Sequence, residues 1–241
     1  MCYIVQGLVP DGPVMSILAA ADQRLDLPIS AYLSLTGAAV DSDSMMQLGL
    51  ASHQIPDENA AEELVRYLAA FPPDAPPEDL DAALNHFCEW HSDPAMKEAS
   101  NEVIASSGVV LPEEDNDGPW TSEEQAAMKA CFGEAQSVEE TWNLLEARKG
   151  SGCLWSASAL DGLREAPALS LLATARLARE SQNLSAAEVC TLSAQVAARL
   201  AQSPPFESMV QYDQNGTSAA LTTVEDIMAV TRDEVESLFE S

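Results

Sequence analysis

The sequence predicts a mixed α/β to mostly α protein, in which a short α/β remnant precedes a helical half. Residues 1–71 combine short helical patterns with one β-like segment, and residues 72–120 form an acidic, proline-containing connector. Residues 121–241 show helical periodicity with helix-start signals. The chain has 241 residues and is 46% hydrophobic, which is enough for one large domain or two small ones with a core.

The charge balance excludes some classes of partner. Eleven basic residues against 39 acidic ones give a net charge of −28. Binding along a nucleic-acid backbone needs clustered Lys and Arg, which this sequence lacks, so we expect little direct RNA contact. An anionic membrane would repel the chain, and no apolar run is long enough for a membrane span, so no membrane insertion is expected. The acidic excess predicts a solvated surface, or one that faces a basic protein partner.

We expect any RNA contact to be confined to the sites near four basic residues: Arg148, Lys149, Arg176 and Arg179.

The thiol and imidazole groups do not form a site in the sequence. The five cysteines are dispersed without a CxxC pair: Cys2, Cys88, Cys131, Cys153 and Cys190. Such a set favours reduced thiols and a non-secreted protein. The three histidines, His53, His86 and His91, lack ligand spacing, and we interpret them as surface or packing residues. We therefore predict no metal site and no cofactor.

The stretch 31–55 carries the most informative pattern of the first part. Its apolar residues Tyr32, Leu33 and Leu35 predict a short helix that ends at Thr36-Gly37, because glycine readily adopts the left-handed conformation past a helix end. Asp41 or Ser42 is expected to cap a second helix that Gly49 ends. Its expected inner face is Met45, Met46 and Leu48.

Two elements follow this second helix. Residues 50–55 predict a short β-like segment. Residues 60–71 predict a helix with Asp57 or Asn59 as its cap. The inner face expected for that helix is Leu64, Tyr67, Leu68 and Phe71.

The stretch 31–55 resembles the crotonase superfamily, in which "LTG…A…GLA…V" links the core to the trailing helices. The resemblance is closest to the 3-hydroxyisobutyryl-CoA hydrolase branch, for which "YLALTG" and "GIATH" are typical; "YLSLTG" and "GLASH" stand here. The resemblance implies a truncated crotonase-like (ClpP/crotonase) remnant that corresponds to the C-terminal part of the family, in a degenerate form.

A second segment concerns the family's catalytic carboxylates. In these hydrolases "PE…IGLFPDVGG" carries a Glu and, eight residues later, an Asp. The segment 7–12, "GLVPDG", is similar to its second part and places Asp11 at the aspartate position; Tyr3 then falls at the glutamate position and Cys2 at the proline. Because Tyr3 is not a carboxylate, the family's acid/base pair is incomplete. Asp11 is therefore a vestigial catalytic candidate, and we expect it to be a helix cap or turn residue. No catalytic residue is predicted.

The resemblance also implies where the remaining chemistry lies. In the family, two backbone N–H groups hold the thioester oxygen, and they come with most of the CoA pocket from the half that precedes the segment matched by 7–12. We expect this chain to lack that half, and hence to be no enzyme. A sheet edge left open would need another chain to cover it or to supply the missing half.

The second half is predicted as a series of helices. The first is expected to start at Thr121 or Ser122, where 122–125 resembles a capping box. Ser137 caps a helix over 138–149 with Val138, Trp142 and Leu145 on its inner face. A helix pair over 159–180 is broken at Pro167, and helices are expected over 185–202 and 222–239. The acidic segment 92–120 is predicted to be a linker. Similar segments of the family include "CF…SVEEIIERL" at 131–150, and "DFxEGVRA", weakly kept at 205–210.

These observations lead to an expectation about function. Members of this branch without activity are subunits of mitochondrial small ribosomal subunits. The resemblance therefore implies a non-enzymatic, hydrolase-derived structural subunit, peripheral in that mitochondrial assembly and held by neighbouring basic protein subunits. Two alternatives stay open: the C-terminal half of a split acyl-CoA thioester hydrolase, and a subunit of another organellar complex.

Overall fold

The structure, a computed structural model, describes residues 9–48, 50–51, 53–55, 58–72, 76–92, 120–203 and 221–240; the side chains of residues 58, 77, 81 and 88–92 lie outside this description. These residues are mostly α-helical, as predicted, and Val40 alone among them has a β-bridge assignment. The chain divides into two compact units. The large unit is Met1–Asp41 with Trp120–Ser241, and the small unit is Ser42–Pro119. The predicted division into 1–71, 72–120 and 121–241 stays a prediction.

The large unit opens with two helices whose ends follow local rules. Helix α1 (Gly12–Leu25) begins at Asp11, whose side chain accepts a hydrogen bond from the Val14 N–H, and it ends at Asp26 in the left-handed conformation (φ 52°). Helix α2 (Ile29–Thr36) ends at Gly37 with φ 62°, and the Gly37 N–H donates to the Leu33 carbonyl. The prediction for this helix end is confirmed, because the left-handed residue there has no Cβ to clash.

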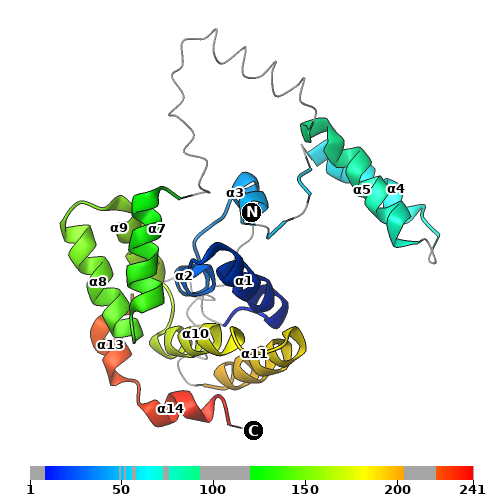
Figure 1. The fold of residues 1–241 in the computed structure, drawn as a ribbon. Helices are drawn as coiled ribbons and strands as arrows, with labels where there is room; N and C mark the ends of the chain where they lie inside the picture. Colours follow the sequence, from blue (N-terminus) through cyan, green and yellow to red (C-terminus); the bar gives the residue numbers. More distant parts are fainter. Residues whose placement is uncertain are drawn as a thin grey trace, which may run out of the picture. The chain divides into compact units, whose positions relative to one another are not determined.

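The later helices of the large unit lie to the left of and below α1 and α2 in Figure 1. They are α7 (Ser122–Met128), the π-helix η1 (Lys129–Glu134), α8 (Val138–Gly150), α9 (Leu154–Arg164), α10 (Ala168–Ser181) and α11 (Ala186–Leu200). Ser137 caps α8 as predicted, and Pro167 separates α9 from α10. The capping box of α7 lies one residue earlier than predicted, between Thr121 and Glu124, because Thr121 is the last residue with extended backbone.

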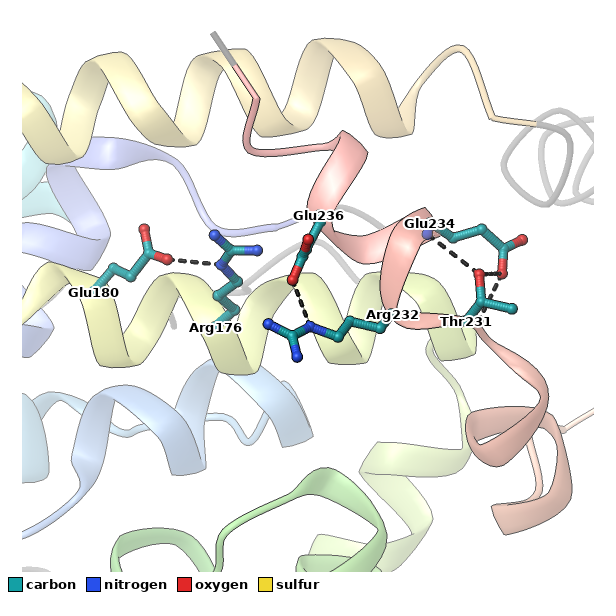
Figure 2. Close-up of polar contacts among 6 residues, drawn as sticks. All are labelled: Arg176, Glu180, Thr231, Arg232, Glu234 and Glu236. Atoms are coloured by element: carbon teal, nitrogen blue, oxygen red, sulfur yellow. Dashed lines mark hydrogen bonds and ion pairs between the residues drawn. The ribbon is translucent and has the colours of Figure 1, made fainter.

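The C-terminal tail forms two short helices, α13 (Val224–Ala229) and α14 (Arg232–Ser237), where one helix was expected. Val230 has extended backbone, and the Thr231 side chain accepts from the Glu234 N–H to start a new helix. Figure 2 shows this box, with Arg232 bonded to Glu236 on α14. Local capping by Thr231 therefore overrides the continuous helical pattern.

One apolar cluster joins α1, α10, α11 and the tail. Its buried members are Val9, Met15, Ala173, Leu177, Ala178, Val189, Val196, Leu200 and Leu238. Helix α1 approaches α11 closely at its first residue, since a Cβ on Gly12 would lie 2.2 Å from the Cα of Cys190. A glycine is therefore required at this crossing.

An aromatic cluster surrounds Tyr32 on α2. The Tyr32 ring stacks on Trp155 at a centroid distance of 5.1 Å and meets Trp120 and Phe132 edge-on at 5.7 Å and 5.5 Å. Tyr32 is buried, and burial raises the pKa of its hydroxyl to about 12. The raised pKa keeps the buried hydroxyl of Tyr32 neutral. We therefore assign this aromatic cluster to the core.

The small unit contains α3 (Ser42–Gln47), α4 (Glu58–Ala69) and α5 (Pro77–Ser92). Leu48, the residue just after α3, is buried as expected. Met46, which lies within α3 and was predicted on its inner face, is exposed. The β-like segment predicted at 50–55 is wrong for its described residues, none of which is in a strand. The N–H groups of Leu50 and Ala51 instead donate to the Met45 carbonyl at 2.8 Å and 3.2 Å, so they are bonded to the end of α3.

Helix α4 confirms the helix predicted over 60–71, and α5 lies inside the segment 72–120 that was predicted as a connector. The Tyr67 ring contacts Phe71 and Phe87 at centroid distances of 5.3 Å and 5.6 Å. Tyr67 is nevertheless half-exposed, because two helices cannot enclose a side chain from all sides. The linker predicted at 92–120 and the segment 205–210 lie almost wholly outside the described residues.

Candidate functional site

Asp11, the carboxylate at the family's aspartate position, lies at the first turn of α1. Its Oδ1 accepts a hydrogen bond of 2.9 Å from the Val14 N–H, and its side chain is exposed. The interpretation of Asp11 as a helix cap is confirmed. Tyr3 and Cys2, the residues predicted at the glutamate and proline positions, lie outside the described residues.

A second carboxylate on α1, Asp22, has a different environment. Its Oδ1 accepts from the Ser30 N–H at 2.7 Å, and its Oδ2 accepts from the Ser30 hydroxyl. The residue that precedes α2 is Pro28, which provides no side-chain cap. Asp22 therefore caps the start of α2 from the neighbouring helix, across the turn at 26–28.

The same carboxylate also reaches the end of α10. Gln182 donates from Nε2 to the Asp22 Oδ2 at 2.7 Å, and Gln23 donates from Nε2 to the Gln182 carbonyl at 3.3 Å. Asp22, Ser30 and Gln182 thus connect three helices through hydrogen bonds. We call these three residues the Asp22 network.

The Asp22 network lies beside an open groove of about 300 Å³. The groove is lined by Asp22, Gln23, Asp26, Leu27, Pro28, Lys129, Gly133, Glu134 and Gln182. Lys129, the first residue of η1, forms an ion pair of 2.6 Å with the Asp26 carboxylate. A π-helix is uncommon and recurs at functional sites, and here it supplies one wall of the groove.

The two carboxylates near the end of α1 are shifted in opposite directions. Burial raises the pKa of Asp22 above its ordinary value of 3.8, and the hydrogen bonds from Ser30 and Gln182 only partly oppose this. The hydrogen bond from Lys129 lowers the pKa of Asp26, which is exposed. Asp22 therefore keeps its proton to a higher pH than Asp26 does.

The structure does not bring Asp11 and Asp22 together. They are separated by eleven positions on one straight helix, a separation of about 16 Å at 1.5 Å per residue. The groove therefore does not contain the predicted candidate. Sequence reasoning missed Asp22 because its partners are non-local: Gln182 is 160 positions away.

The contacts of the described histidines agree with their interpretation as surface or packing residues. No group of three His, Cys, Asp or Glu in the described part of the chain could hold a metal ion. His53 bonds to Asn85 at 3.2 Å, and the His86 ring packs on Phe87. Cys131, Cys153 and Cys190 are free thiols, and burial raises the pKa of Cys131.

Among the helices described, none has the length and apolar character that crossing a bilayer requires.

Comparison with known proteins decides the family. A family model for enoyl-CoA hydratase/isomerase matches residues 2–239. The chain belongs to the enoyl-CoA hydratase/isomerase family. A comparison with curated proteins gives no significant match.

Two solved structures are similar to this chain in fold. One is a carnitinyl-CoA dehydratase from Mycobacterium thermoresistibile, with a TM-score of 0.65 and 18% identity. The other is an enoyl-CoA hydratase from Rhodobacter sphaeroides 2.4.1, with a TM-score of 0.58 and 23% identity. Each alignment covers 97% of this chain and 56% of the other chain, so this chain spans about half the length of these relatives. The crotonase-like fold predicted from the motifs is confirmed.

Proposed function

We propose that the chain is a non-catalytic, structural member of the enoyl-CoA hydratase/isomerase family, derived from its 3-hydroxyisobutyryl-CoA hydrolase branch. It would act as a subunit of a large organellar assembly. The favoured assembly is the mitochondrial small ribosomal subunit, with this chain at its periphery.

The assignment to the hydrolase branch rests on three motifs. These are "GLVPDG" at 7–12, "YLSLTG" at 32–37 and "GLASH" at 49–53. Two of them contain residues that end or begin a helix: Asp11 caps α1, and Gly37 ends α2. These two motif residues therefore have a role in the fold that does not depend on catalytic activity.

The observation that carries the non-catalytic proposal is the state of Asp11. Its carboxylate is already bonded to the Val14 N–H as a cap, and Tyr3 stands at the position of its glutamate partner. A tyrosine cannot replace a carboxylate as a base near neutral pH, because its ordinary pKa is near 10. Both observations support a chain that lacks the family's acid/base pair.

The proposed placement rests on charge. At −28 the chain is repelled by phosphate and attracted to basic proteins. Of the four cations that the sequence suggested for RNA contact, Arg176 is already bonded to Glu180 at 2.7 Å and lies 4.1 Å from the centre of the Phe239 ring. These contacts favour a position determined by protein neighbours.

Two experiments test this proposal. The purified chain should show no turnover of 3-hydroxyisobutyryl-CoA or an enoyl-CoA; turnover that Asp11→Asn abolishes would refute the non-catalytic role. In a sedimented organelle lysate, the chain should migrate with the small ribosomal subunit. A chain that stays at the top of the gradient as a monomer would refute the structural role.

One alternative has an observation in its favour. Because the alignments cover 56% of the relatives' chains, this chain could pair with a separate chain that supplies the oxyanion-binding half of a split thioester hydrolase. Adding that half should then produce turnover that neither chain shows alone. Asp11→Asn would test whether the vestigial carboxylate takes part.

A further inference from the structure

The helical hairpin of the small unit, α4 and α5, exposes an apolar groove. The groove has a volume of about 500 Å³ and is lined by Tyr67, Ala70, Phe71, Pro72, Asp79, Ala82, Ala83 and His86. The lining residues of α5 are spaced i, i+3, i+4 and i+7, so they form one face of that helix. The groove therefore follows the length of this face.

The hairpin lacks the core that its sequence would predict. Among the described side chains of α4 and α5, only Leu64 and Ala83 are buried. Tyr67 is 50% exposed and Val65 is 66% exposed. Two amphipathic helices cannot bury both of their apolar faces against each other, and a third helix in the groove would complete the packing.

The charges of the hairpin indicate the chemistry of that third helix. Its described side chains include four exposed carboxylates, Glu62, Glu63, Glu78 and Asp79. The single Lys or Arg among them is Arg66, which is bonded to Glu62 at 2.7 Å. Asp79 lines the groove itself, so an occupant meets an apolar floor with an acidic edge.

We propose that the α4–α5 groove docks a basic amphipathic helix of a neighbouring protein. Apolar side chains of that helix at i, i+3, i+4 and i+7 would cover Tyr67 and Ala82, which are exposed in the groove, and its Lys or Arg residues would face Asp79. A second copy of this chain is disfavoured as the occupant, because its own helices carry the same negative charge. This inference rests on the proposed structural role, for which it names the surface and the partner.

The test uses the full chain and a defined peptide probe. The probe is a helix of about 18 residues, or five turns, with Leu at i, i+3, i+4 and i+7 and Lys at the exposed positions. A peptide of the same composition in scrambled order serves as the control for charge. Binding is measured by fluorescence anisotropy at about 0.15 M salt, where non-specific attraction between distant charges is screened.

We expect the amphipathic probe to bind at least about tenfold more tightly than the scrambled one. Ala82→Lys, which places a cation in the groove, should weaken binding by about tenfold. Ala69→Lys is the matched control, because Ala69 is exposed on the same hairpin but does not line the groove; it should change binding less than about twofold. Lysine is nearly as good a helix former as alanine, so both variants should fold.

Three results would overturn the proposal. Equal binding of both peptides, or equal weakening by both lysines, would mean attraction to overall charge only. A concentration-dependent dimer that Ala82→Lys abolishes would make a second copy the occupant. Failure of the probe to bind while the chain still sediments with an assembly would refute this surface alone. A chain that binds the probe in the groove but sediments with no assembly would refute only the structural role.

Discussion

Gly162 on α9 lies directly against the main-chain carbonyl of Thr36 at the end of α2. A Cβ on Gly162 would lie 2.1 Å from the Thr36 oxygen and 2.9 Å from its carbonyl carbon. Both atoms belong to the backbone and cannot move aside as a flexible side chain would. The approach of these two helices therefore depends on the missing side chain.

We predict that Gly162→Ala destabilises the large unit. Overpacking of this kind typically costs about 1–3 kcal/mol of unfolding free energy. Urea unfolding measures the change. Gly150→Ala is the matched control, because a Cβ there meets nothing within 4 Å, and it should be neutral or stabilise by up to about 1 kcal/mol. Equal effects of the two variants would contradict the close approach.

Asp22→Asn should remove a pH dependence of stability. Burial raises the pKa of Asp22 in the folded chain above 3.8, so the folded state binds this proton more tightly than the unfolded state. The contribution of Asp22 to the unfolding free energy is therefore fully present below pH 3.8 and is lost as the pH rises through the folded pKa. Urea unfolding of both proteins between about pH 3 and 7 should show the wild type losing stability relative to the variant.

The neighbouring Asp26 provides the control with the opposite sign. Its pKa is lowered by Lys129, so its contribution is present above 3.8 and is lost as the pH falls. The stability of the wild type relative to Asp26→Asn should therefore increase with pH, by a small amount because the pair is exposed. The same sign for both carboxylates would contradict the assignment.

Asp11→Ala should destabilise α1 through loss of the N-cap. Replacement of a capping carboxylate by alanine costs about 0.5–2 kcal/mol. Asp11→Asn retains an acceptor oxygen for the Val14 N–H and should unfold close to the wild type. If thermal unfolding shows that alanine is tolerated as well as asparagine, the cap contributes nothing and another role for Asp11 must be sought.

Arg199→Met should release α14 from the large unit. The Arg199 guanidinium donates from Nη1 to the carbonyls of Ser237 and Leu238 at 3.1 Å and 3.0 Å, where α14 ends. Loss of these charge-assisted bonds should raise amide exchange rates in α14 by about tenfold, equivalent to about 1.4 kcal/mol. Arg232→Met, which removes only the pair within α14 drawn in Figure 2, should change exchange far less, because exposed pairs contribute little.

The sequence by itself determined the helices that have local signals. Ser137 before α8 and Gly37 after α2 were both predicted, because caps bond to backbone groups within a few residues. The motifs at 7–12 and 32–37 also gave the crotonase-like fold, which the family match confirms. Asp11 was correctly interpreted as a cap for the same local reason.

The tertiary structure decided what depends on distant partners. Residues 50–55 have a strand-like pattern, but the N–H groups of Leu50 and Ala51 donate to the Met45 carbonyl near the end of α3. Asp22 acquires its raised pKa only where folding buries it beside Ser30 and Gln182. Burial and long-range hydrogen bonds arise from packing, and no spacing along the chain encodes them.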